Sequence, residues 1–140
     1  MTYAGFWKRF AAAFIDGLIT AVLGALAGGI IGFIYGASAG STATVEEAEI
    51  LGQIAGFLVG WIYFSSFESS SKQATLGKMA LGIKVTDMNG EPIGFGKASG
   101  RYFGKIISVL IFFMGYIMVA FTQKKQGLHD IMAGCLVVNK

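Results

Sequence analysis

The residues of this sequence that could do chemistry are one arginine, two aspartates and the single histidine. Arg9 precedes a long apolar run, Asp16 is the only charge in that run, and His129 and Asp130 are adjacent later in the chain. Carboxylates beside a guanidinium can bind a cation or exchange a proton, because neighbouring charges shift their pKa values. Histidine has an unperturbed pKa close to physiological pH, which suits a proton relay. These four residues form a candidate ion or coupling site.

Asp16 lies within an apolar segment of membrane length, where placing a charge costs free energy. Residues 10–36 read FAAAFIDGLITAVLGALAGGIIGFIYG. A carboxylate in a membrane helix is by default a functional-site hypothesis, and it usually has a cationic partner or a path to water. Arg9 precedes Asp16 by two helical turns, roughly 10 Å along the axis, so the two side chains could meet directly or through one water. The alternative is an ordinary pair of interfacial anchors.

The composition predicts a small integral membrane protein. Hydrophobic residues make up 54% of the chain and charged residues only 14%. Three apolar segments, residues 10–36, 50–67 and 106–123, are each long enough to cross a hydrocarbon core, which takes about 18 residues or more. We expect a single, mainly α-helical membrane domain over residues 1–140. Its first two segments form a transmembrane hairpin, and the third apolar segment either spans the membrane or re-enters it.

The distribution of charge predicts the orientation. The loop between the first two segments carries Glu46, Glu47 and Glu49 without lysine or arginine, whereas the loop at about 68–105 carries six lysines and arginines. By the positive-inside rule, the N-terminus and the basic loop are cytoplasmic. We expect the basic loop to face the anionic headgroups of the lipid bilayer, because its charge density is too low for a nucleic-acid surface.

Glycine recurs at every fourth position in the first two segments. Such ridges let helix backbones approach closely in lipid, as in a glycine zipper. The two ridges could pack against each other within one chain, or one could face a second subunit. The helix-packing residues are Gly24, Gly28, Gly32 and Gly36 in the first segment and Gly52, Gly56 and Gly60 in the second.

A small β-structure is predicted in the basic loop and at the C-terminus. Alternating apolar residues at 83–85 and 93–95 flank Asn89-Gly90, a dipeptide that favours a hairpin turn. Residues 135–138 could supply a third strand, which requires a cytoplasmic C-terminus. A plain third span would place that strand outside. We therefore favour a cytoplasmic C-terminus. A helix break near Gly115, covered by protein or water, would let residues 106–123 enter and leave on that side, although each arm would have only about eight residues, roughly 12 Å of helix.

Four stretches of the sequence resemble the RDD family of small membrane proteins, which is named for one arginine and two aspartates. They read YAGFWKRFAAAFID, TLGKMALGIKV, FGKASGRYFGK and, near the end, QGLHD followed by AG. The resemblance implies that Arg9 is the arginine of the family, that Asp16 is its first aspartate and that Asp130 is its second. No activity is established across the family, for which transport of unidentified ligands is suggested. We expect a protein of the bacterial cytoplasmic (inner) membrane.

The sequence does not favour an enzyme. Gly77-Lys78 lacks the upstream glycine and the following hydroxyl residue of a phosphate-binding loop, and Gly94, Gly96 and Gly100 do not have dinucleotide-site spacing. One histidine and one cysteine form no metal-ligand cluster of familiar spacing. We expect no catalytic residues, no metal and no cofactor.

Two functional hypotheses follow. In the first, a homo-oligomer, or a complex with another membrane protein, moves a small cation, a proton or a small solute through an acidic cluster of Arg9, Asp16 and Asp130. In the second, a noncatalytic scaffold or assembly factor docks partner proteins through its cytoplasmic hairpin and tail. For the cluster itself the alternative to an ion site is a buried salt-bridge network that docks the tail onto the helices.

Overall fold

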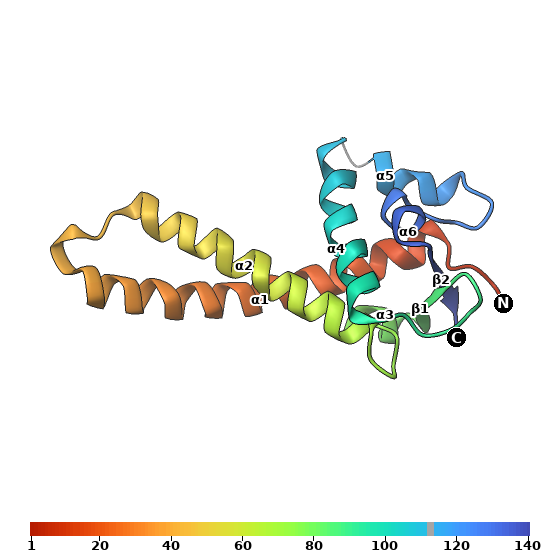
Figure 1. Cartoon of the computed structure of the whole chain (residues 1–140), viewed down its shortest axis with the longest axis horizontal. Helices are drawn as coiled ribbons and strands as arrows, with labels where there is room; N and C mark the ends of the chain where they lie inside the picture. Colours follow the sequence, from red (N-terminus) through yellow and green to blue (C-terminus); the bar gives the residue numbers. More distant parts are fainter. Residues whose placement is uncertain (112–113) are drawn as a thin grey trace. The chain divides into compact units, whose positions relative to one another are not determined.

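The chain is mostly helical in the computed structural model, which describes residues 1–111 and 114–140 (Figure 1). It forms two compact units. We call Met1–Asp16 together with Phe64–Lys140 the head unit, and Gly17–Tyr63 the hairpin unit. In chain order the elements are α1 (Phe6–Ala39), η1 (Gly40–Thr42), α2 (Val45–Glu68), α3 (Leu76–Ala80), β1 (Ile83–Asp87), α4 (Phe95–Leu110), α5 (Met114–Ile117), η2 (Met118–Ala120), α6 (Leu128–Ala133) and β2 (Cys135–Asn139).

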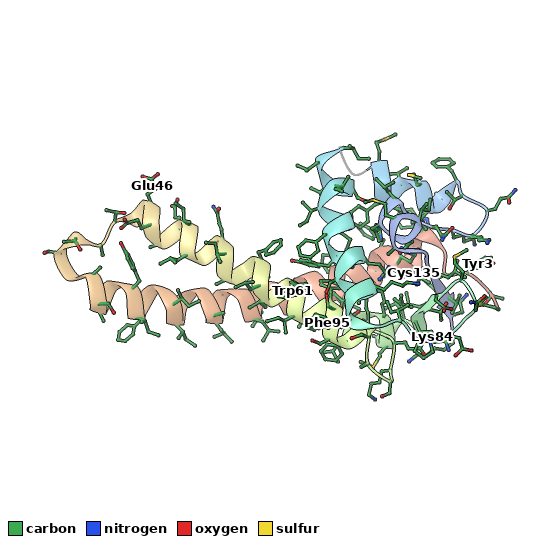
Figure 2. The ribbon with its side chains drawn as sticks, in the orientation of Figure 1. Tyr3, Glu46, Trp61, Lys84, Phe95 and Cys135 are labelled. Carbon is green, nitrogen blue, oxygen red and sulfur yellow. The ribbon has the colours of Figure 1, made fainter. Side chains whose placement is uncertain are left out.

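Helices α1 and α2 are long and apolar enough to cross a membrane. Along α1, the large apolar residues Leu18, Val22, Leu26 and Ile30 recur every fourth position and are each more than half exposed. Figure 2 shows side chains pointing outward along both helices of the hairpin. A continuous apolar surface of this kind is stable in hydrocarbon and not in water. The chain is therefore an integral membrane protein, and the two spans predicted at residues 10–36 and 50–67 are confirmed.

Within the hairpin unit, the two helices approach through glycine. A Cβ atom built on Gly24 would lie 3.7 Å from the Gly56 Cα, and one on Gly28 would lie 3.8 Å from the Gly52 Cα. A Cβ on Gly32 or Gly36 would meet nothing within 4 Å. Part of the first ridge thus faces the second within this chain, and the rest of it faces open space.

In the head unit, β1 pairs antiparallel with β2, in a register that places Val85 opposite Val137. Tyr3 bridges the other edge of β2 at Val138, so Tyr3, Lys84 and Cys135 lie around one small sheet (Figure 2). A two-stranded sheet is marginal in water. Its apolar face is buried in a core with α4 and the start of α1, through Ala98 and Ala12 among others.

The C-terminal strand predicted at 135–138 is confirmed, but the predicted hairpin is not formed. After β1, the Asp87 carboxylate accepts the N–H groups of Asn89 and Glu91 and closes a local turn. Pro92 has no N–H group to donate to a ladder. Helix α4 begins at Phe95, and Ile93 packs in the core. Two alternating apolar positions are too short a signal to distinguish a strand from a buried loop.

The third apolar segment, predicted at 106–123, does not continue as one straight helix. Helix α4 begins well before it, at Phe95, and the segment Met114–Ala120 makes an angle of 114° with α4. Residues 112 and 113 of this prediction lie outside the described residues. Because β2 pairs with β1 and Tyr3 bridges β2, the C-terminal strand lies on the same side of the membrane as the N-terminus and β1.

Candidate functional site

Asp130 lies at the centre of a group of buried charged side chains. Its Oδ1 accepts from Arg101 Nε at 3.1 Å and from Arg101 Nη2 at 2.5 Å. Its Oδ2 pairs with the Arg9 guanidinium and accepts the Gly127 backbone N–H at 3.0 Å. The carboxylate is fully buried. Both of its oxygens are therefore occupied by donors from the protein.

Glu68 forms the second half of the group. Its Oε2 pairs with Arg101 Nη1, and its Oε1 lies 2.5 Å from Lys78 Nζ and 3.9 Å from Lys105 Nζ. Arg101 thus bridges Glu68 and Asp130, and all three are almost completely buried. We call the following six side chains the ion-pair cluster: Arg9, Glu68, Lys78, Arg101, Lys105 and Asp130.

Five helices of the head unit supply these side chains. Arg9 lies in the first turn of α1, and Glu68 is the last residue of α2. Lys78 comes from α3, and Asp130 from the first turn of α6. Arg101 and Lys105 are four residues apart in α4, a spacing that places both on one helix face. The cluster therefore joins the first turn of one membrane helix to the last turn of the other.

Asp16 is held at a different place. Its Oδ2 accepts from the Thr75 hydroxyl at 2.6 Å, and its Oδ1 accepts from the Gly77 N–H at 2.8 Å. Thr75 is the N-cap of α3. The positive end of the α3 peptide dipoles and the amide donors there stabilise a buried carboxylate.

Glycine is required where Asp16 meets α3. A Cβ built on Gly77 would lie 2.8 Å from the Asp16 Cγ, and closer still to the Ala12 carbonyl oxygen. Real Cβ atoms essentially never approach so closely. Thr75 and Gly77 of the TLGK sequence therefore form the binding site for the aspartate in α1, and Lys78 of the same sequence reaches Glu68.

The structure brings three of the four predicted residues together. Arg9, His129 and Asp130 are in contact, and Asp16 lies with Thr75 and Gly77. The sequence predicted an acidic cluster, whereas the ion-pair cluster contains two arginines, two lysines and two carboxylates. Burial lowers the pKa of Lys105 to about 7, so near neutral pH the positive charges exceed the negative charges by between one and two.

Sequence reasoning missed Glu68, Lys78, Arg101 and Lys105. The signals were present but were interpreted as membrane topology. Glu68 ends the second apolar segment, and lysine or arginine recurs every fourth residue at 97, 101 and 105. That spacing places three cations on one face of a helix, which needs a buried carboxylate if the face is packed.

His129 is buried beside Arg9 and Asp130. Its Nε2 lies 3.3 Å from Arg9 Nη2 and 3.4 Å from Asp130 Oδ1, and its ring packs on Tyr116 with centroids 5.1 Å apart. Its Nδ1 has no hydrogen-bond partner among residues 1–111 and 114–140. Burial lowers the pKa of His129 well below its usual value, and the nearby Asp130 opposes this without reversing it. The imidazole is therefore neutral at physiological pH.

Asp130 keeps its charge. Burial acts to raise its pKa, but the Arg9 and Arg101 guanidiniums outweigh burial and hold the pKa of Asp130 far below its usual range. Near neutral pH, neither Asp130 nor His129 changes protonation state. Within the described part of the chain, no group of three or more histidine, cysteine, aspartate or glutamate side chains could hold a metal ion.

Comparison with known proteins gives a family match over nearly the whole chain. A model of the RDD family matches residues 3–134, a range that contains the whole ion-pair cluster. The Bacillus subtilis (strain 168) protein YxaI is 40% identical, with 98% of this chain and 97% of YxaI covered. The membrane protein YteJ of the same organism is 31% identical, with 99% of this chain and 82% of YteJ covered. No solved structure matches the chain.

Replacing Gly77 with alanine tests the contact between Asp16 and α3. Gly77→Ala should lower the free energy of unfolding by about 1–3 kcal/mol, because the added methyl group overpacks this contact. Gly100→Ala in α4 is the matched control, since a Cβ there meets nothing within 4 Å. Gly100→Ala should be neutral or stabilising by about 0.5–1 kcal/mol. Unfolding of the detergent-purified protein, followed by circular dichroism, gives both values, and equal effects would contradict the assignment.

The buried neutral histidine predicts a pH dependence of stability. The unfolded chain binds a proton at His129 below its usual pKa of 6.5, whereas the folded chain does not. The contribution of His129 to stability is therefore complete above about pH 6.5 and falls by about 1.4 kcal/mol per pH unit below it. The contribution of Asp130 is lost only at lower pH, below its usual pKa of 3.8.

Unfolding of the wild type and of His129→Gln between pH 8 and pH 5 measures this contribution. The chain has one histidine, so the difference between the two profiles isolates its titration. The wild type should lose stability more steeply than the variant below pH 6.5. Parallel profiles would show that His129 takes up a proton equally well in the folded state.

Proposed function

Because this chain belongs to the RDD family, we propose that it is a noncatalytic membrane protein whose head unit is a docking module for other membrane or soluble proteins. The observation that supports this proposal is that the carboxylates of the ion-pair cluster already bind donor groups of the protein itself. All four carboxylate oxygens of Glu68 and Asp130 already receive donors from the protein. A network of this kind fixes the helices that contribute to it. Its carboxylate oxygens are already engaged and do not serve as ligands for a transported ion.

The charges of the cluster and of His129 also support a structural role. A proton carrier needs a group that titrates near working pH, and Asp130 and His129, the residues predicted for that role, do not supply one, because their pKa values are both held below neutrality. Within the cluster, burial lowers the pKa of Lys105 to about 7, but its ammonium lies beside Glu68, which keeps its charge. A cation site needs accessible oxygen ligands and a negative balance of charge. The cluster has an excess of positive charge. Its geometry therefore supports a structural role in holding the head unit.

We place this module on the cytoplasmic side of a bacterial cytoplasmic membrane. The head unit contains both the N-terminal residues and the basic stretch 68–105, whereas the loop between α1 and α2 is acidic around Glu46. Positive charge is retained on the cytoplasmic side during insertion. The two relatives described above are both bacterial proteins.

A second candidate is transport of an ion or small solute by a homo-oligomer. The observation in its favour is the buried His129 Nδ1, a polar atom without a partner among the described residues, in a ring that contacts Arg9 and Asp130. In the described part of the chain, two helices, or three if α4 and the bent segment after it form one span, could cross a membrane, and that number is too few to enclose a path within one chain. Gly32 and Gly36 of α1 face open space within this chain, and a second copy could pack there.

Reconstitution into liposomes separates the two candidates. The liposomes carry a pH gradient and Na⁺ and K⁺ gradients, followed with enclosed fluorescent indicators. The docking proposal predicts that the gradients decay as slowly as in protein-free liposomes, both for the wild type and for Asp130→Asn. Faster decay with the wild type that is lost in Asp130→Asn would establish transport. Glu91→Gln, an exposed change outside the cluster, is the control for purification and insertion.

Docking itself is tested by photo-crosslinking in the native membrane. A photoreactive residue at Met88, which is exposed on the head unit, should give discrete adducts with one or a few proteins. The same residue at Phe33, which is exposed on the apolar surface of the hairpin unit, should give mainly lipid adducts. If Met88 gives no protein adduct beyond those at Phe33, the docking proposal fails.

A further inference from the structure

The ion-pair cluster carries more positive charge than its own carboxylates offset. The buried acidic residues among the described part of the chain are Asp16, Glu68 and Asp130. Asp16 is engaged by Thr75 and Gly77 at the N-terminus of α3. Glu68 and Asp130 therefore face four cationic side chains. Burying a charge without a counter-charge is costly, so an additional anion at this place would stabilise the fold.

The excess of positive charge is greatest around Glu68. This single carboxylate faces Arg101, Lys78 and Lys105. Both lysines also lie against the ring of Phe64, with Nζ of Lys78 at 5.6 Å and Nζ of Lys105 at 3.9 Å from the ring centroid. A ring face offsets part of an ammonium charge, by about 0.5–2 kcal/mol, but it does not neutralise it.

Lys105 is the member of the cluster whose ammonium group lies within ion-pair distance of a carboxylate but beyond hydrogen-bond distance of it. Its Nζ is 3.9 Å from the nearest Glu68 oxygen, beyond hydrogen-bond distance. Its side chain is 16% exposed, the largest value among the cluster side chains. The ammonium group is thus held between a buried carboxylate, an aromatic ring and the protein surface, where an external acceptor can reach it.

The surface beside Lys105 is apolar. In α4, Val109 lies one turn beyond Lys105 on the same helix face and is 44% exposed, and the adjacent Ile106 is 38% exposed. Glu68, the partner of Lys105, is the last residue of α2, a helix long and apolar enough to cross a membrane. The ends of such helices reach the headgroup region of a bilayer. An anion that binds here therefore lies where lipid headgroups lie, next to a surface that suits acyl chains. Basic pockets at the ends of membrane helices bind anionic headgroups in this way.

We propose that an anionic phospholipid completes the ion-pair cluster. Its phosphate group accepts from Lys105 Nζ, with Lys78 and Arg101 adding to the positive field, and its acyl chains lie along the exposed apolar residues of α4. Phosphatidylcholine does not fit this role, because its own ammonium group cancels the charge of its phosphate. The site does not depend on whether the head unit docks a partner protein.

Thermal unfolding of the full-length protein in neutral detergent tests the proposal. Adding dioleoyl-phosphatidylglycerol should raise Tm by about 3 °C or more, the shift expected from about tenfold saturation of one site. The same amount of dioleoyl-phosphatidylcholine should leave Tm unchanged. Inorganic phosphate should also have little effect, because it lacks acyl chains. Equal shifts with both lipids, or a full shift with inorganic phosphate, would overturn the lipid site.

Two variants assign the effect to Lys105. Lys105→Gln should lose most of the shift caused by phosphatidylglycerol, whereas Lys97→Gln, an exposed lysine two turns earlier in α4, should retain it. Native mass spectrometry from mixed lipid and detergent micelles supplies a second readout that does not require unfolding. The wild type and Lys105→Arg should retain phosphatidylglycerol over phosphatidylcholine. Equal retention of the two lipids by the wild type would contradict the proposal even if Lys105→Gln fails to fold.

Discussion

The head unit depends on the burial of one guanidinium between two carboxylates. Arg101 is almost inaccessible to water, and it donates to Glu68 on one side and to Asp130 on the other. A buried ion of this kind is tolerated only when its partners are in place, and removing one partner typically costs 3–5 kcal/mol. The end of α2, the middle of α4 and the start of α6 must therefore occupy fixed positions around Arg101.

Other parts of the head unit follow from that arrangement. Asp130 also pairs with Arg9, which brings the first turn of α1 to α6. Gly134, in the left-handed conformation with φ 63°, ends α6 and turns the chain directly into β2. β2 then pairs with β1, a two-stranded sheet that packing must support. The charges thus position the small core.

Local patterns in the sequence predicted the parts of the structure that depend on local chemistry. The two membrane spans follow from uninterrupted apolar runs, and the C-terminal strand follows from four consecutive apolar residues at 135–138. The contact of Arg9 with Asp130 agrees with the predicted cluster of these two residues, in which the C-terminal tail returns to the start of the first membrane helix. The prediction of a β-hairpin in the basic loop was wrong. The Asp87 side chain accepts hydrogen bonds that close a local turn after β1, and helix α4 begins a few residues later.

The remaining contacts could not be read from local patterns. Arg101 and Glu68 are 33 residues apart, and Asp16 and Thr75 are 59 apart, so only the folded chain brings them together. Thr75 and Gly77 also show how polar groups far away in the sequence can engage a buried aspartate. A hydroxyl group and an amide at a helix N-terminus hold Asp16. Arg9 was considered as the partner of Asp16 because it is the nearest cation on the same helix face. In the structure, Arg9 pairs with Asp130 instead.

A double-mutant cycle on Arg101 and Glu68 tests the central claim most directly. Arg101→Met, Glu68→Met and the double variant are compared by reversible unfolding in mixed micelles. If the buried pair holds the head unit, each single variant leaves a buried charge without its partner. The double variant should then be more stable than the sum of the single effects predicts, by at least about 1 kcal/mol. Additive effects, within about 0.5 kcal/mol, would show that the two side chains do not depend on each other.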